Sequence, residues 1–188
     1  MLSSSLYRGV GAYLVLAHQA KVTVDAGYSS MFSASVFGLF GICVAVGQAS
    51  AFISERIGRE KTIILAAILS IGAVVSLLTV RDTSHAVLLY LYAACSGCGT
   101  GLYSPAIVVA MVDIFHGRHL GARAALLLTG TGAGGAIDPW LGGYIYDISG
   151  SYGSAFLLCI ACFGIACATV WIAAPRNAAR LRAVFETT

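Results

Sequence analysis

Three short motifs in the sequence could carry chemistry. Residues 130–135, GTGAGG, fit the G-x-G-x-x-G pattern of loops that bind dinucleotides. Residues 95–98 and 159–162 are C-x-x-C pairs, a spacing found in zinc sites. Asp138 follows the glycine motif and precedes a proline, and an acid held away from water can serve as a proton site. The elements around these motifs decide whether nucleotide binding, metal binding or proton exchange is physically reasonable.

The composition identifies those elements as membrane helices. Of 188 residues, 59% are hydrophobic and 10% are charged, against roughly 25% charged residues in soluble domains. The net charge of +3 is too small to favour a nucleic acid partner. Six apolar segments are predicted to cross a bilayer as helices, at residues 6–24, 31–53, 62–80, 86–112, 124–146 and 153–174. The predicted fold class is all-α integral membrane, a single domain over residues 1–188 with a tail at 175–188.

The first of these segments is the least regular. Its uncharged part, residues 9–20, is too short to span a bilayer alone. Extending it brings in Arg8 and Lys21, which lie near its ends, where long basic side chains can reach the interface. We expect a spanning helix here, while a remnant of a longer helix stays open. A cleaved signal peptide is the rival interpretation, but residues 18–21, HQAK, are a poor cleavage site.

The basic residues predict that both ends are cytoplasmic, and we expect the chain to lie in the plasma membrane. Nine basic residues then face the cytoplasm and two, Lys21 and Arg81, face outward, which satisfies the positive-inside rule. The nine are Arg8, Arg56, Arg59, Lys61, Arg118, Arg123, Arg176, Arg180 and Arg182. The three arginines of the tail are expected to rest on anionic headgroups.

Inside membrane helices the first two motifs lose their chemical meaning. A dinucleotide loop must follow a strand and open a helix, whereas residues 130–135 lie within a predicted span. Gly130 and Gly134 lie on one helix face, as do Gly97 and Gly101, and small residues at this spacing let helices pack closely. The C-x-x-C cysteines are interpreted as small apolar residues. We therefore expect no metal and no cofactor.

Two spans share a pattern of glycine, polar residue and proline. Residues 101–105 read GLYSP and residues 135–139 read GAIDP. Proline removes a backbone hydrogen bond and crowds the carbonyl four residues earlier, which is a glycine in both cases. The predicted hinge residues are Gly101, Pro105, Gly135 and Pro139. The alternative is purely structural, with each proline as a bend and Ser104 bonded to its own backbone.

A second repeat lies at the ends of the second and fifth spans. Residues 55–59, ERIGR, and 147–151, DISGS, each have an acid, two residues, a glycine and a polar residue. They follow the second helix of each three-helix group, on opposite membrane faces. This is the pattern that an inverted three-plus-three repeat leaves in a sequence.

These residues carry a resemblance to a known family. Residues 47–61, GQASAFISERIGREK, resemble the cytoplasmic signature of the major facilitator superfamily. Residues 138–156, DPWLGGYIYDISGSYGSAF, resemble its eleventh and twelfth helices, closest to the monocarboxylate and oxalate/formate porter branches. Residues 18–30 resemble the end of its seventh helix. The matching signature residues are Gly47, Glu55, Arg56, Gly58 and Arg59. The resemblance implies a twelve-helix transporter of two halves, of which this chain matches the carboxyl-terminal half.

Three positions depart from the family's pattern. Glu55 stands where aspartate is usual, Glu60 stands where a second basic residue is common, and Asp138 stands where the two branches carry glycine. The eighth helix of monocarboxylate carriers often holds an arginine for the substrate anion, and the matching segment, 31–53, has no arginine.

The resemblance also implies where the solute passes. The first and fourth spans would line the path, so that Tyr13, His18, Tyr103 and Ser104 are candidate pathway residues. From the residues alone, His18 could equally face a water-filled cavity or the membrane interface. The second and fifth spans would face the missing half, with Asp138 at that interface.

We therefore predict a secondary transporter of a small solute, such as an organic anion of the monocarboxylate class. It would work by alternating access against a second six-helix half, either separately encoded or a second copy of this chain. Coupling would be to protons, with Asp138 as the coupling residue, or to an exchanged solute. The alternatives are a neutral Asp138 that only fills space and a truncated or accessory six-helix protein without transport activity. An enzyme is not expected.

The cytoplasmic signature is also predicted to act as a latch. Its charged residues would tie one helix end to its neighbours. The predicted cluster comprises Glu55, Arg56 and Arg59, with Arg123, Asp113 and the amino end of the fifth span as partners. The alternative is that the basic residues only hold this loop on the cytoplasmic side.

Overall fold

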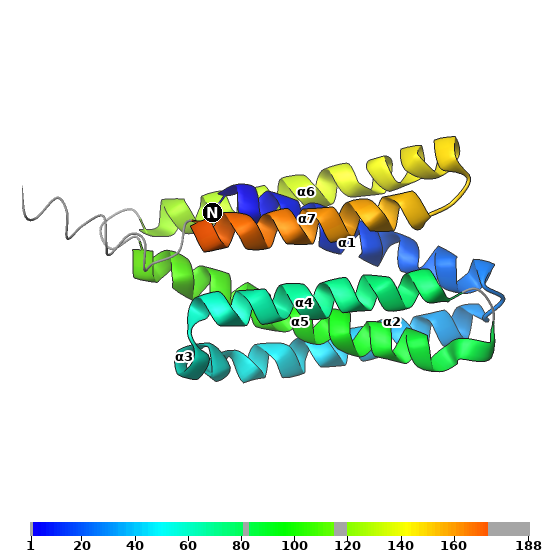
Figure 1. Ribbon diagram of the computed structural model, residues 1–188, viewed down its shortest axis with the longest axis horizontal. Helices are drawn as coiled ribbons and strands as arrows, with labels where there is room; N and C mark the ends of the chain where they lie inside the picture. The colour runs from blue at the N-terminus through cyan, green and yellow to red at the C-terminus, as the bar shows by residue number, and fades with distance from the viewer. Residues whose placement is uncertain (1, 81–82, 115–119, 173–188) are drawn as a thin grey trace, which may run out of the picture.

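The computed structural model describes residues 2–80, 83–114 and 120–172, and every regular element in these ranges is a helix (Figure 1). The helices are α1 (Leu2–Asp25), α2 (Ser30–Ala49), α3 (Ile53–Ile57), α4 (Arg59–Thr79), α5 (Ala86–Ile114), α6 (Leu120–Ser149) and α7 (Gly153–Ile172), with 3₁₀ turns η1 (Ser50–Phe52) and η2 (Thr83–His85). The predicted tail at 175–188 and the loop basic residues Arg81 and Arg118 lie outside the described residues.

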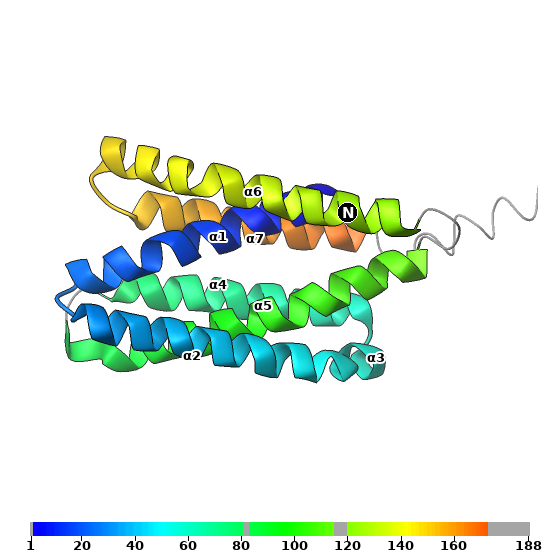
Figure 2. The same ribbon diagram turned by 180° about the vertical axis from the view of Figure 1, so that it is seen from behind.

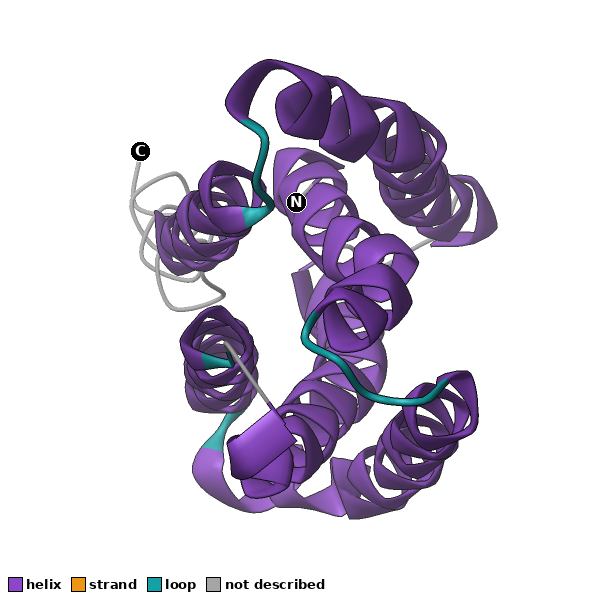
Figure 3. Cartoon of the chain, turned by 90° about the vertical axis from the view of Figure 1, so that its right-hand side faces the viewer, coloured by secondary structure: helices purple, strands orange, loops and turns teal. Residues whose placement is uncertain are grey.

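The long helices pack in two groups of three. One group is α1, α6 and α7, and the other is α2, α4 and α5. Contacts of α4 with α7, and fewer of α1 with α2, join the groups. Viewed along the helices, the two groups form the two halves of the bundle (Figure 3). Each packing group therefore combines helices from both halves of the sequence: α1 packs with α6 and α7, and α5 packs with α2 and α4.

Four helices of the described residues are long and apolar enough to cross a membrane: α2, α4, α7 and residues Ala86–Asp113 of α5. The remaining two predicted spans form α1 and α6, which are as long but more polar. Arg8, Gln19 and Lys21 lie on α1, and glycines and Asp138 lie on α6. That α1 and α6 also cross the bilayer stays a prediction.

The predicted second span is wrong at its end. A single helix was expected over residues 31–53, but α2 stops at Ala49. Ser50 closes it, since its backbone N–H bonds to the Gln48 and Val46 carbonyls and its hydroxyl donates to the Val46 carbonyl at 2.8 Å. The chain then turns through η1 and α3 and reverses at Gly58, which has a φ of 94°. Only glycine adopts such a φ readily, which explains this signature residue.

The glycine motif of residues 130–135 lies inside the continuous helix α6 and packs against α1. A Cβ at Gly134 would stand 2.6 Å from the Val10 nitrogen, and one at Gly130 would stand 3.0 Å from the Leu2 carbonyl oxygen. On α5, a Cβ at Gly97 would stand 2.6 Å from the Phe40 carbonyl oxygen of α2. The prediction that these glycines form helix-packing surfaces is confirmed.

Candidate functional site

A cavity of about 450 Å³ lies among α1, α2, α5 and α6. Figure 2 shows α2 and α6 on the near side of the bundle, with α4 and α7 behind them. The walls are mainly apolar, and the polar groups on them come from α1, α5 and α6. The lining residues used below are Ser5, Arg8, Tyr13, Thr100, Tyr103, Ser104 and Thr131.

Arg8 is the charged residue of this cavity, and it is only 5% exposed. Its Nη2 donates to the Thr100 hydroxyl at 3.1 Å. Its guanidinium carbon lies 5.1 Å from the centroid of the Tyr103 ring and 4.7 Å from that of Phe163. The described residues place no carboxylate within ion-pair distance of Arg8, and its Nε has no hydrogen-bond partner among them. The cation is therefore held by two aromatic faces and one hydroxyl, without a countercharge.

Arg8 was expected at the cytoplasmic end of its span with its side chain reaching the membrane interface, and its burial shows that this expectation is wrong. Helix α1 begins at Leu2, so Arg8 lies about 9 Å along it at ~1.5 Å per residue. The burial pattern of α1 carries the missed signal. Ser4, Arg8, Gly11 and Val15 recur at helical spacing, and all are buried. This stripe of small and apolar residues faces the bundle, and it takes Arg8 inward with it.

Three of the four predicted pathway residues line the cavity: Tyr13, Tyr103 and Ser104. The Tyr103 hydroxyl lies 3.4 Å from that of Ser4, which in turn donates to the Ala166 carbonyl of α7. Ser104 donates to the Thr100 carbonyl at 3.1 Å, so it satisfies its own helix, as the structural alternative for this residue required.

His18, the fourth predicted pathway residue, does not line the cavity. Its ring centroid lies 4.9 Å from that of Tyr152, at the opposite end of the bundle from α3. Its Nε2 is buried against α6 at Gly142 and has no hydrogen-bond partner among the described residues. Beside it, Lys21 Nζ lies 4.2 Å from the centroid of the Tyr146 ring. His18 therefore belongs to the α1–α6–α7 contact and not to the cavity wall.

Asp138 was expected at the interface with a missing half, and this expectation is wrong. Its exposed fraction is 0%, whereas its neighbours Ile137 and Trp140 are 47% and 68% exposed. Asp138 shares one helix face with Gly134 and Gly142, four residues away on either side, and this face packs on α1. Helical geometry thus turns the acid inward, and the aromatic residue beside it outward.

The carboxyl group of Asp138 lies between α1 and α7. It stands beside the α1 backbone at Leu14 and near the thiols of Cys159 and Cys162. Neither of its oxygens has a hydrogen-bond partner among the described residues. An unpaired polar group without access to water costs stability, so this acid is a candidate for a function beyond packing.

The predicted hinges lie within unbroken helices, α5 through Pro105 and α6 through Pro139. Gly101 is closed in by α2, because a Cβ there would stand 2.8 Å from the Cα of Gly47. This contact gives Gly47 a packing role in the α2–α5 crossing. A Cβ at Gly135 would stand 2.9 Å from the Tyr13 ring. Bending at these sites stays a prediction.

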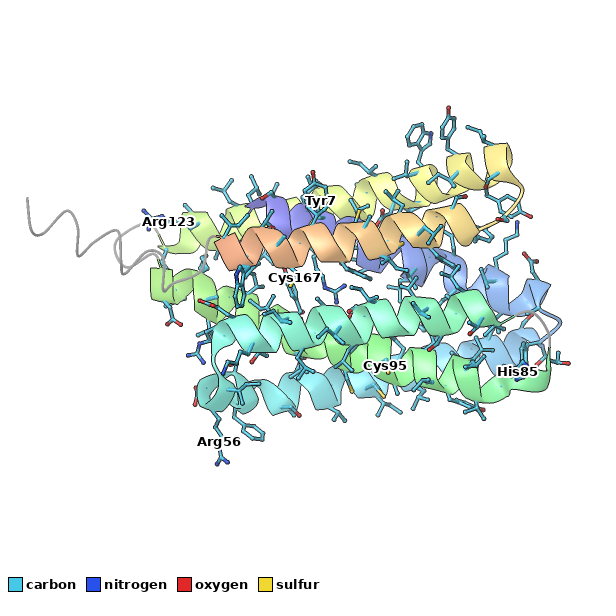
Figure 4. The ribbon with its side chains drawn as sticks, in the orientation of Figure 1. Tyr7, Arg56, His85, Cys95, Arg123 and Cys167 are labelled. Carbon is cyan, nitrogen blue, oxygen red and sulfur yellow. The ribbon has the colours of Figure 1, made fainter. Side chains whose placement is uncertain are left out.

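The signature charges gather around Arg59. Its Nε lies 3.1 Å from the Asp113 carboxylate, and its Nη1 donates to the Ser54 hydroxyl at 3.2 Å. The contact joins the start of α4 to the end of α5. Glu55 and Arg56 are exposed and form no ion pair within the described part of the chain, and Figure 4 shows Arg56 pointing away from the bundle. A latch role for the predicted cluster stays a hypothesis, with Arg59 at its centre.

The C-x-x-C cysteines are free thiols on α5 and α7. Within residues 2–80, 83–114 and 120–172, no group of three or more His, Cys, Asp or Glu side chains is placed to hold a metal ion.

The model of the Major Facilitator Superfamily matches residues 1–186 of the chain. No curated protein sequence matches it.

Proposed function

The chain belongs to the Major Facilitator Superfamily, a family of multi-pass membrane transporters of small solutes, and on that premise we propose that it binds a small organic anion at Arg8 as one half of a secondary transporter. The observation that carries the proposal is the buried guanidinium of Arg8 in the cavity, without a carboxylate partner among the described residues. A buried charge is costly unless it is paired. A solute anion would supply the missing countercharge.

The shape and polarity of the cavity favour a monocarboxylate. One arginine can bind one carboxylate through two parallel hydrogen bonds, and the unpaired Nε of Arg8 is one donor for such a contact. The remaining lining includes apolar residues such as Ile107, Val108 and Leu127, which suit an apolar body. A cavity of about 450 Å³ holds a small molecule. Monocarboxylate carriers often hold an anion-binding arginine in the helix that matches residues 31–53, where this chain has none. We propose that Arg8 on α1 takes that role.

A second half would complete the path. Around the cavity, Tyr13, Val108 and Leu128 are 43%, 42% and 70% exposed. In the proposed assembly, these residues face a second six-helix half or a second copy of this chain, and the two halves rock about the bound anion. Both ends of the chain face the cytoplasm, and transport is coupled to protons or to an exchanged solute.

Equilibrium binding to the full chain in lipid nanodiscs tests the anion site, with radiolabelled lactate and benzoate as probes and choline as a cationic control. A charge-assisted hydrogen bond contributes about 1.5–3 kcal/mol. Arg8→Gln is therefore expected to weaken lactate or benzoate binding by roughly tenfold to a hundredfold. The matched control is Arg56→Gln, which removes an exposed arginine outside the cavity and is expected to bind like wild type.

Two outcomes would count against the proposal. If Arg8→Gln binds the anions as tightly as wild type, the buried guanidinium is not the anion site. If folded wild-type chain binds neither anion, the accessory six-helix alternative is favoured instead. Circular dichroism and thermal unfolding of each variant separate lost binding from lost folding.

A further inference from the structure

We propose that Asp138 and His18 together form a proton-binding site inside the α1–α6–α7 group, separate from the Arg8 cavity. The proposal rests on the proposed transport function, because a transporter can use such a site to link solute movement to a proton gradient. The ligand is a proton, delivered from water at the end of the bundle opposite α3. Neither Asp138 nor His18 lines the cavity.

The first support is that the carboxyl group of Asp138 and the Nε2 atom of the half-buried His18 are buried without partners. The two oxygens of Asp138 and Nε2 of His18 have no hydrogen-bond partner among the described residues. Each could accept a proton, and either protonated group could donate a charge-assisted hydrogen bond to the other when the two come within reach. Two unsatisfied titratable groups in one helix contact are unusual, because buried polar groups are normally paired.

The second support is the register between α1 and α6. The two helices run in the same direction (Figure 1), with Leu14 beside Asp138 and His18 against Gly142. Leu14 and His18 are four residues apart on α1, and Asp138 and Gly142 are four apart on α6. One helical turn, about 6 Å along the axis, therefore separates the acid from the imidazole. The proposed proton transfer between them therefore requires a displacement of α1 along α6 or a bridging water.

Gly142 makes this arrangement possible. A Cβ at this position would overlap the imidazole ring of His18, so only glycine lets the ring lie against α6. The adjacent Gly143 has no atoms within 4 Å of an added Cβ. Gly143→Ala is therefore a matched control for Gly142→Ala, because only the substitution at Gly142 disturbs His18.

Other titratable groups around the site define its charge. The thiols of Cys159 and Cys162 approach Asp138 from α7. Around His18 lie Tyr152 and, at the far end of α1, Lys21 over the rings of Tyr146 and Tyr152. Arg8 lies more than a turn from Leu14 toward the α3 end. Among these groups the cation nearest His18 is Lys21.

The proton transfer is balanced in charge. His18 takes a proton on Nε2 from a hydronium ion, which becomes water, and the imidazolium N–H donates this proton to an oxygen of the Asp138 carboxylate. This leaves a neutral imidazole and a neutral carboxylic acid. Helix α1 links this step to the solute, because it carries Arg8 in the cavity and also covers Asp138 with Leu14.

Infrared difference spectroscopy of the full chain in lipid tests the proton site without requiring transport. Wild type is expected to show a carboxylic acid C=O band that disappears as the pH rises. The band is expected to be lost in Asp138→Asn, and its titration midpoint to shift in His18→Gln and in Gly142→Ala but not in Gly143→Ala. A wild-type spectrum without a band that is sensitive to Asp138→Asn would overturn the proposal, as would an unchanged midpoint in both His18→Gln and Gly142→Ala.

Lactate transport in vesicles then separates this proposal from the proposed function. Asp138→Asn is expected to retain lactate binding and lactate–lactate exchange but to lose accumulation driven by a proton gradient. Equal gradient-driven accumulation in wild type and Asp138→Asn would refute the role of the site in coupling. If Arg8→Gln loses lactate binding but keeps the infrared titration of Asp138, the result bears on the anion site and leaves the proton site in place.

Discussion

Replacing Gly134 by alanine is expected to separate α1 from α6. The added methyl group would stand 2.6 Å from the Val10 nitrogen, 2.8 Å from the Leu6 carbonyl oxygen and 2.9 Å from the Gly9 carbonyl carbon. All three atoms belong to the backbone of α1, so no side chain can rotate away. Ordinary contact begins at 3.4 Å, so the helices must part by roughly 0.8 Å at this point.

The size of the effect follows from two opposing terms. A gap of about 0.5–1 Å forfeits a quarter to a half of the dispersion energy of the neighbouring contacts, and overpacking typically costs ~1–3 kcal/mol. Alanine in place of glycine inside a helix contributes about 0.5–1 kcal/mol in the other direction. Gly132 isolates the second term, because it lies two residues away on α6 and has no atoms within 4 Å of an added Cβ.

Reversible unfolding in mixed micelles measures the free energy of unfolding of both variants. Gly132→Ala is expected to match or slightly exceed wild type, and Gly134→Ala to fall below Gly132→Ala by ~1–3 kcal/mol. The propensity term cancels in this difference. If the two variants agree within about 0.5 kcal/mol, the scatter expected of an ordinary surface substitution, the close α1–α6 contact does not stabilise the chain as reasoned above.

Two further predictions concern contacts between helices. Phe163→Leu removes one of the two aromatic faces around Arg8, a cation–π contact of about 0.5–2 kcal/mol. This variant is expected to weaken lactate binding up to about thirtyfold. Unchanged binding would mean that the Phe163 ring contributes nothing to holding the guanidinium. Asp113→Asn removes the partly exposed ion pair with Arg59 and is expected to change the free energy of unfolding by less than about 1 kcal/mol. A cysteine cross-link between the start of α4 and the end of α5 is expected to form more slowly in this variant. An unchanged cross-linking rate would contradict the latch.

The helical class and the packing role of the glycines could be predicted from sequence, because both depend on local pattern. Gly130 and Gly134 are four residues apart, and this spacing alone places them on one helix face. The inward position of Asp138 was also within reach, since it shares that face by the same spacing. It was missed because family resemblance, and not helical register, was used to orient the helix.

Contacts between distant parts of the chain could not be predicted in the same way. Arg59 and Asp113 are 54 residues apart, and nothing local to either residue identifies its partner among the other charges. Arg8 was assigned to the membrane edge because its segment is short in uncharged residues. Its burial depends on Thr100 and on two rings from α5 and α7, which only the folded bundle brings to one place.

Helix α1 runs without a proline or a break from Leu2 to Asp25, and it carries Arg8 toward one end and His18 toward the other. An uninterrupted helix moves as a rod, so the two residues share each displacement. Suppose that the anion and the proton both bind more tightly when α1 occupies the same one of its positions. The two binding events are then coupled, and thermodynamic coupling is reciprocal. The factor by which lactate raises the proton affinity must equal the factor by which protonation raises the lactate affinity.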